Sequence, residues 1–210
     1  MTIKIFVSYR RSKSSSEAGR IADRLIAKFG KDNVFMDVHS IPLGQNFVTH
    51  IQNKVAECDA FLAVIGRGWL NAKDKNGERR LHKPTDFVRI EIAAALQREI
   101  LLIPVLLENT PMPMADQLPE ELGELSRYQK LSVRHESFDR DIESLIRDLA
   151  ALDAGDDASF PWAPQHAAQY DTYGMVEIGQ RVVVLRPPRR RTDSYGSSVL
   201  EKGMVTRKRD

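Results

Sequence analysis

One uninterrupted apolar run, residues 60–65, limits what this chain can fold into more than any other stretch. Its letters, Ala-Phe-Leu-Ala-Val-Ile, include no polar side chain, so both faces of the segment have to be buried. A strand buried on both faces is typical of the centre of a parallel sheet, where helices cover both sides. The run therefore predicts the α/β class.

Further strands and helices are expected to alternate around this run. Short apolar runs predict strands at residues 3–7, 34–36, 100–107 and 129–133. Helical spacing of apolar residues predicts helices at 18–29, from Phe47 onward, and at 85–96, 118–125 and 142–152. We expect a polar loop at residues 12–16, and a free edge or local break at Pro104. The alternation predicts a parallel five-stranded sheet with helices on both faces.

Composition adds limits on location and class. The chain has 210 residues, 42% of them hydrophobic and 29% charged, which is typical of a globular protein. No apolar run approaches the roughly 18 residues of a membrane span, and the N-terminus lacks the pattern of a signal peptide. The single cysteine, Cys58, excludes an internal disulfide and suits a reducing compartment. We therefore expect a cytoplasmic protein with no membrane partner.

Three segments follow predicted strands directly and should meet at one edge of the sheet. They are residues 8–11, 37–46 and 66–83, and the last leads into the helix at 85–96. Because parallel strands end at the same edge, and ligands of such sheets bind there, these segments are expected to line a binding site.

The helix at 85–96 carries a carboxylate in an otherwise apolar sequence. Thr85 or Asp86 can cap its first turn, and Phe87 and Glu91 lie four apart on one helical face. A ring beside a carboxylate suits a ligand with a flat cationic ring next to a sugar. The alternative is that Glu91 is solvated near the helix's positive end and Phe87 packs in the core.

Three separated motifs occur in the order that one known family shows. They are Ile-Phe-Val-Ser-Tyr-Arg-Arg at 5–11, Val-Phe-Met-Asp with Ile-Pro-Leu-Gly between 34 and 44, and Asp-Phe-Val-Arg-Ile-Glu-Ile at 86–92. They resemble the opening strand, the second strand with its BB loop, and the third helix of TIR domains. The match identifies residues 1–153 as a TIR domain, similar to bacterial NAD-cleaving members.

The resemblance implies a flavodoxin-like fold and cleavage of NAD to nicotinamide and ADP-ribose or a cyclic isomer. It places Glu91 at the position of the catalytic glutamate. NAD is then the substrate, and neither a cofactor nor a metal is expected. The implied substrate contacts are Tyr9, Arg10, Arg11, Phe47 and Phe87, with Arg10 and Arg11 toward the pyrophosphate.

The resemblance also implies self-assembly with other TIR domains through the BB loop. It further implies an unidentified activating partner or domain, and a role in bacterial defence against phage or, alternatively, in virulence. The alternative function is a non-catalytic module that binds other TIR domains through the same loop. The residues of this assembly loop are Asp37, Ile41, Pro42, Leu43 and Gly44.

Other classes of site lack their patterns. The five histidines show no metal-ligand spacing, and neither a P-loop nor a nucleophile elbow occurs. The stretch at 66–71 lacks the third glycine of a dinucleotide fingerprint. Asp37 could suggest a phosphoacceptor, but the acidic pair that such a site needs after the first strand is missing.

Residues 154–210 are expected to form a linker and a basic extension. The net charge of +2 arises there, since residues 155–210 hold 9 Lys and Arg against 7 Asp and Glu. Residues 176–185 are expected to form either one arm of a β-hairpin or a strand pair. A faint resemblance to the opening of formylglycine-generating-enzyme-like domains leaves two interpretations, a truncated remnant of a second domain or a solvated extension. Nucleic acid is not an expected partner.

Overall fold

The structure is a computed structural model that describes residues 2–36, 44–153, 175–178 and 181–184. The chain divides into two units, residues 1–163 and 164–210. The second unit contains an antiparallel pair, β6 (Met175–Ile178) and β7 (Arg181–Val184), which confirms the predicted strand pair. The linker from residue 154 and the basic run at 186–191 lie outside the described residues.

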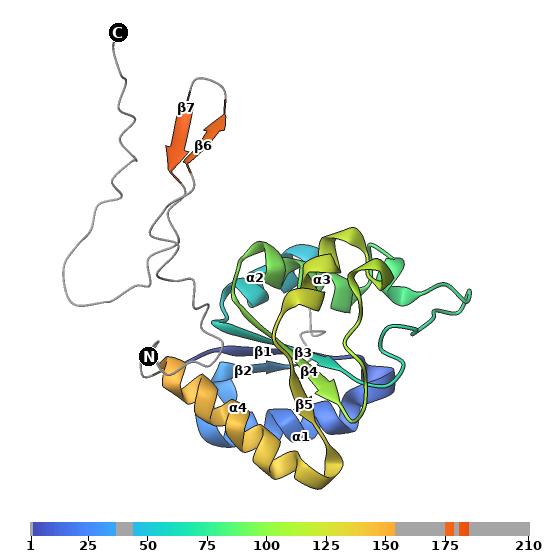
Figure 1. Cartoon of the computed structure of the whole chain (residues 1–210), viewed down its shortest axis with the longest axis vertical. Coiled ribbons are helices and arrows are strands. Elements are labelled where there is room, and N and C mark those ends of the chain that lie inside the picture. Colours follow the sequence, from blue (N-terminus) through green and yellow to red (C-terminus); the bar gives the residue numbers. More distant parts are fainter. Residues whose placement is uncertain (1, 37–43, 154–174, 179–180, 185–210) are drawn as a thin grey trace, which may run out of the picture. The chain divides into compact units, whose positions relative to one another are not determined.

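The first unit holds a five-stranded parallel sheet between two layers of helices (Figure 1). This confirms the predicted fold class, and the strand order β2-β1-β3-β4-β5 is the flavodoxin-like one. The carboxyl ends of β1 and β3 flank the point where the winding direction reverses, which is the usual ligand position in such sheets. The strands are β1 (Ile5–Ser8), β2 (Val34–Met36), β3 (Ala60–Ile65), β4 (Leu101–Leu107) and β5 (Leu131–Val133).

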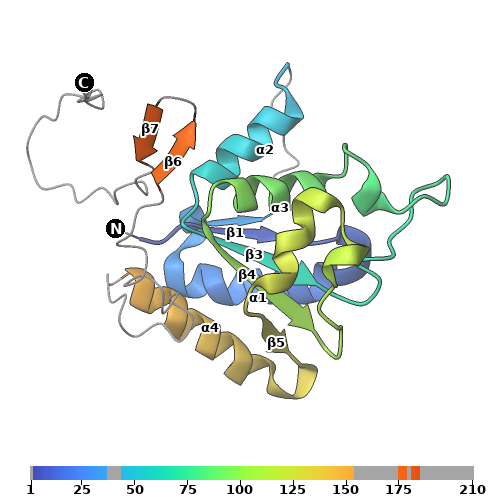
Figure 2. The ribbon, with the colours of Figure 1, turned by 45° about the horizontal axis from the view of Figure 1, so that its top comes forward.

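The described α-helices cover the sheet in pairs (Figure 2). Helices α1 (Arg11–Phe29) and α4 (Phe138–Asp153) pack on one face, and α2 (Phe47–Ala56) and α3 (Phe87–Gln97) on the other. Alternation along β1 divides the core, because Val7 packs with the α1 layer and Phe6 with the α3 layer. None of the described helices combines the length and apolar character that a membrane crossing needs.

Pro104 lies where one side of β4 has no strand partner. It faces Ala63 of β3, but β5 begins to pair with β4 only at Val105. A proline cannot donate a backbone hydrogen bond, so this is a position where its missing N–H is tolerated. The free edge expected from the sequence is confirmed.

One local prediction was wrong. The serine-rich stretch 12–16 is helical: the Ser14 N–H donates to the Arg10 carbonyl over 3.0 Å, and a kink at Ser14 (φ −147°, ψ 23°) follows. Ser14 is 1% exposed, so tertiary packing outweighs the preference of serine for loops. The short helix predicted at 118–125 is present, as the 3-10 helix η4 (Glu120–Arg127).

The long polar segment 66–83 is anchored rather than loose. Trp69 is 1% exposed, so its side chain anchors the segment in the apolar core. An isolated bridge joins Lys73 to Arg79, and a short 3-10 helix, η2 (Arg80–His82), precedes α3. The hydrogen bond from Lys83 holds the pKa of Asp74 below its ordinary value. These contacts therefore hold the segment in place immediately before α3.

The buried thiol of Cys58 gives a testable consequence of this packing. It is 5% exposed, and burial raises its pKa from 9.0 to about 12. Because the thiolate is the reactive form, we expect the folded protein at about pH 8 to react with Ellman's reagent at least about tenfold more slowly than the protein in urea. Equal rates would contradict the assigned burial.

The same pKa fixes the sign of a pH effect on stability. A folded-state pKa above the unfolded one gives stability that is complete below pH 9.0 and is lost as the pH rises toward about 12. Urea unfolding of Cys58→Ala should show a smaller loss over this window than unfolding of the unmodified chain.

Candidate functional site

A short hydrogen bond joins the end of β1 to the middle of α3. Ser8 has the same parity as Phe6 along β1, so it faces the α2 and α3 layer. Its hydroxyl donates to Oε2 of Glu91 over 2.6 Å, and Glu91 is only 6% exposed. The structure thus places the sequence-predicted carboxylate at the carboxyl edge of the sheet, held by a neighbour rather than solvated.

The start of α3 is set by Asp86. Its Oδ1 accepts from the Arg89 N–H over 3.1 Å, which confirms that Asp86 can act as the helix cap. Phe87 is the first residue of the helix and Glu91 lies about one turn further along. The cap therefore fixes the position of both predicted site residues.

Arg10 has a different environment from the one expected for a phosphate ligand. It is 2% exposed, its two terminal nitrogens donate to the Asp86 carboxylate, and Nε donates to the Trp69 carbonyl over 3.1 Å. In this arrangement a contact with a pyrophosphate would require Arg10 to leave Asp86. Arg10 therefore supports the start of α3 from inside the protein.

The two predicted pocket rings touch each other. Phe47 is the first residue of α2, and Phe87 is the first of α3. Their centroids lie 5.4 Å apart with the planes at 67°, an edge-to-face contact. Both are partly exposed, so the rings bring the starts of two helices together at the surface near Glu91.

The remaining predicted residues are only partly described. Tyr9 is 9% exposed, whereas Arg11, the first residue of α1, is exposed. Asp37, Ile41, Pro42 and Leu43 lie outside the described residues. Gly44 is described and exposed, with a φ of +85° that favours glycine.

Sequence reasoning placed Ser8 in a segment at the sheet edge without predicting its contact with Glu91, and it did not assign Asp86 to the site. The alternation of β1 was a usable signal for Ser8, because Phe6 marks the side of the strand that faces the second layer. Asp86 was read only as a helix cap, since its partner Arg10 lies 76 residues earlier in the chain.

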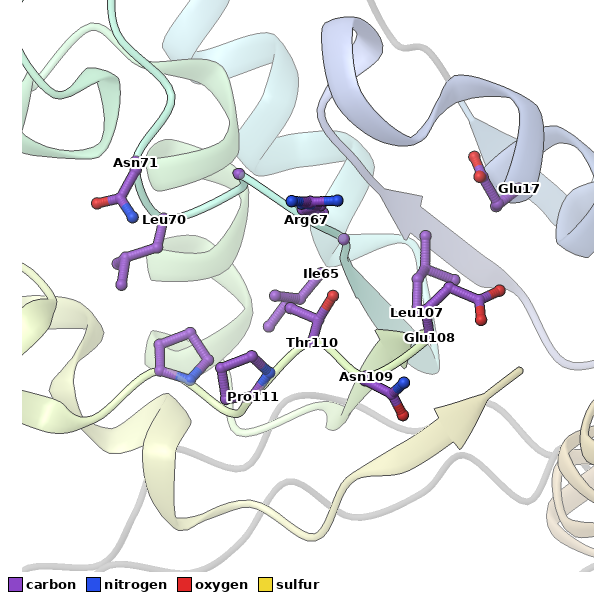
Figure 3. Close-up of a pocket in the computed structure, with 13 residues that line it drawn as sticks. Glu17, Ile65, Arg67, Leu70, Asn71, Leu107, Glu108, Asn109, Thr110 and Pro111 are labelled. Atoms are coloured by element: carbon purple, nitrogen blue, oxygen red, sulfur yellow. The ribbon is translucent and has the colours of Figure 1, made fainter. Parts of the chain in front are cut away.

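A separate cavity of about 560 Å³ opens at the carboxyl ends of β3 and β4 (Figure 3). Ile65 and Leu107 contribute apolar lining, and Arg67 and Asn109 contribute polar lining from the loops after these strands. Its lining does not include Ser8, Asp86 or Glu91. Across the described ranges, no cluster of three or more His, Cys, Asp or Glu could hold a metal ion.

A match to a protein-family model shows which family this chain belongs to. A family model described as TIR domain matches residues 5–146. The chain belongs to the TIR-domain family. The matched range contains Ser8, Asp86 and Glu91, so the geometry above belongs to the TIR domain itself.

Two curated relatives are named as NAD(+) hydrolases. This TIR domain is similar to NAD(+) hydrolase sarm1 of Drosophila melanogaster, with 27% identity over 148 residues, 70% of this chain and 10% of the relative. It is also similar to NAD(+) hydrolase SARM1 of Danio rerio, with 28% identity over 146 residues, 69% of this chain and 19% of the relative. The chain thus spans about a tenth to a fifth of the relatives' lengths.

The fold is also that of a solved TIR structure. The similar chain comes from the TIR domains of the activated Roq1 resistosome directly recognizing the pathogen effector XopQ, with a TM-score of 0.53 and 14% identity. The match covers 70% of this chain and 99% of that one. At this identity the likeness supports the fold.

The Ser8–Glu91 bond predicts a measurable coupling in the free energy of unfolding. In a double-mutant cycle with Ser8→Ala and Glu91→Leu, we expect a coupling of about 1.5–3 kcal/mol, as for a hydrogen bond to a charged group. Urea unfolding of the four proteins measures it. The matched control pairs Ser126→Ala, whose hydroxyl donates to the Gly123 carbonyl, with Glu91→Leu and should give a coupling near zero.

Proposed function

We propose that this TIR domain is an NAD(+) glycohydrolase that cleaves the bond between nicotinamide and ribose. The products would be nicotinamide and ADP-ribose or a cyclic isomer, with NAD as the substrate and no cofactor. The observation that carries the proposal is the buried Glu91 carboxylate, held by Ser8 at the carboxyl edge of the sheet. The relatives named as NAD(+) hydrolases support it at the level of the family.

The chemistry needs little more than a well-placed carboxylate. When the bond to ribose breaks, its electron pair moves to the nicotinamide nitrogen, so the leaving group departs neutral without a proton donor. The ribose carbon passes through an oxocarbenium-like state, as in glycoside hydrolysis. A carboxylate beside it stabilises this charge. Water then adds and a proton is released, or a nucleophilic atom elsewhere in the ADP-ribose closes a ring.

Each described residue near Glu91 has a role in this proposal. Ser8 donates to one carboxylate oxygen and so holds the Glu91 carboxylate in place at the sheet edge. Phe87, packed edge-to-face on Phe47, offers an aromatic surface one helical turn from Glu91 for the nicotinamide ring. Arg11 is exposed and keeps the role of pyrophosphate contact, with Tyr9 beside it.

Self-assembly through the BB loop is part of the proposal. The sequence Ile41-Pro42-Leu43 would present apolar side chains to a second TIR domain, and an activating partner would promote this association. The proposed setting is bacterial defence against phage by depletion of cytoplasmic NAD. The alternative, a non-catalytic docking module, is kept because the chain covers a small part of its NAD-hydrolysing relatives.

Nicotinamide release tests the enzyme directly. Purified protein at high concentration should release nicotinamide from NAD, and Glu91→Ala should lower kcat by at least about 10²-fold, because it removes the charge that stabilises the transition state. The matched control is Glu124→Ala, an exposed glutamate in η4, which should retain full activity. Chromatography of the products separates hydrolysis from cyclisation.

Two outcomes would count against the proposal. Equal release by Glu91→Ala would remove Glu91 from the chemistry. No release by the unmodified chain, even under crowding that drives assembly, would favour the docking module.

Assembly predicts that activity depends on protein concentration. We expect the specific activity to rise with concentration, and Pro42→Asp in the assembly loop to lower this rise, because a charge opposes apolar docking. Light scattering recorded beside nicotinamide release checks both. A strictly monomeric protein with full activity would contradict the assembly part.

A further inference from the structure

A buried ion pair joins the same two elements as the Ser8–Glu91 bond. Arg10 follows β1 by two residues, and Asp86 caps α3. The guanidinium donates to both carboxylate oxygens, over 3.0 and 3.1 Å, and the side chains are 1% and 2% exposed. We propose that Arg10 and Asp86 are positioning residues that hold α3 so that Glu91 meets the substrate in reactive geometry, an inference that rests on the proposed NAD cleavage.

The Ser8–Glu91 and Arg10–Asp86 contacts hold α3 at two different positions along its axis. Asp86 and Glu91 are five residues apart, which is about 7.5 Å along a helix axis. Ser8 and Arg10 are two residues apart in extended chain, which is about 6.6 Å. The two spacings match closely. Two polar contacts at different positions therefore restrain the rotation of the helix and its position along the axis, in addition to its packing in the core.

The Arg10–Asp86 pair also contacts the segment 66–83 at the start of α3. Arg80 Nε lies 3.3 Å from Oδ2 of Asp86, and the Trp69 carbonyl accepts from Nε of Arg10. The guanidinium carbon of Arg10 lies 5.8 Å from the centroid of the Trp69 ring. A displacement of this segment would therefore shift Asp86, and Glu91 would shift with it because Asp86 caps the helix that carries Glu91.

Stability by itself does not require these charges. Transfer of both charged groups from water is costly, and apolar replacements of a buried pair are often equally stable or more stable. Helix α3 also buries Val88, Ile92 and Ala95 in the core, independently of the pair. A fixed geometry is what the bidentate contact adds, and small displacements of a reacting group can cost about 10²-fold in rate.

The test removes both charges together, because either single variant leaves a buried charge without its main partner. In the full chain, Arg10→Met with Asp86→Asn keeps the side-chain volume and an amide that can cap α3. We expect its melting temperature to stay close to that of the unmodified chain. We also expect kcat for nicotinamide release to fall by about 10- to 100-fold, with KM changed by less than about threefold.

A second readout does not depend on activity. The ¹³Cδ resonance of Glu91, assigned by its loss in Glu91→Gln, reports the contact of the carboxylate with Ser8. We expect it to move in the double variant. The matched control is Glu121→Gln, which removes the charge pairing of the same helix with η4 instead of β1 and leaves the contacts of Arg89 with the Leu81 and His82 carbonyls in place. It should leave both kcat and the resonance unchanged.

The outcomes separate the positioning role from the proposed function. A stable double variant with unchanged kcat and resonance would overturn the positioning role, as would an equal loss of kcat in the control. If the unmodified chain releases no nicotinamide, the proposed function fails. The catalytic part of the inference then fails with it, a shift confined to the Arg10 and Asp86 variant supports only the part in which the pair holds Glu91 against Ser8, and no shift overturns that part as well.

Discussion

Burial of the parallel strands on both faces is the constraint on which the rest of this TIR domain depends. It requires helices on both sides, and the alternation of side chains then assigns each strand residue to one layer. In β1 this places Val7 toward α1 and Ser8 toward α3. Glu91 has a hydrogen-bond partner because Ser8, a polar residue, occupies the last position of β1 that faces α3.

The junction between β1 and α3 concentrates the buried charge of the described structure. Arg10, Asp86 and Glu91 are all less than a tenth exposed, and each makes a hydrogen bond with another side chain. Burial of charge is unfavourable unless such partners are present, so a site of this kind needs a rigid frame. The sheet edge and the capped helix supply that frame, and the aromatic contact between α2 and α3 lies beside it.

Sequence reasoning worked best where one physical signal dominated. The apolar run at 60–65 matches β3 residue for residue, and the Asp86 cap marks the start of α3. It failed at residues 12–16, where the loop preference of serine competed with packing and packing prevailed. It located the short helix near residues 118–125 but not its 3-10 type, since apolar spacing does not distinguish a 3-10 helix from an α-helix.

The sequence by itself determined the sheet class, the placement of residues 8–11 at the carboxyl edge of the sheet, and Glu91 as the residue to examine. Those features depend on local periodicity and on the direction of parallel strands, which neighbouring residues specify. Only the tertiary structure decided that Ser8 holds Glu91 and that Arg10 faces Asp86 instead of solvent. Those contacts join residues 83 and 76 positions apart, and such pairings are set by packing in three dimensions.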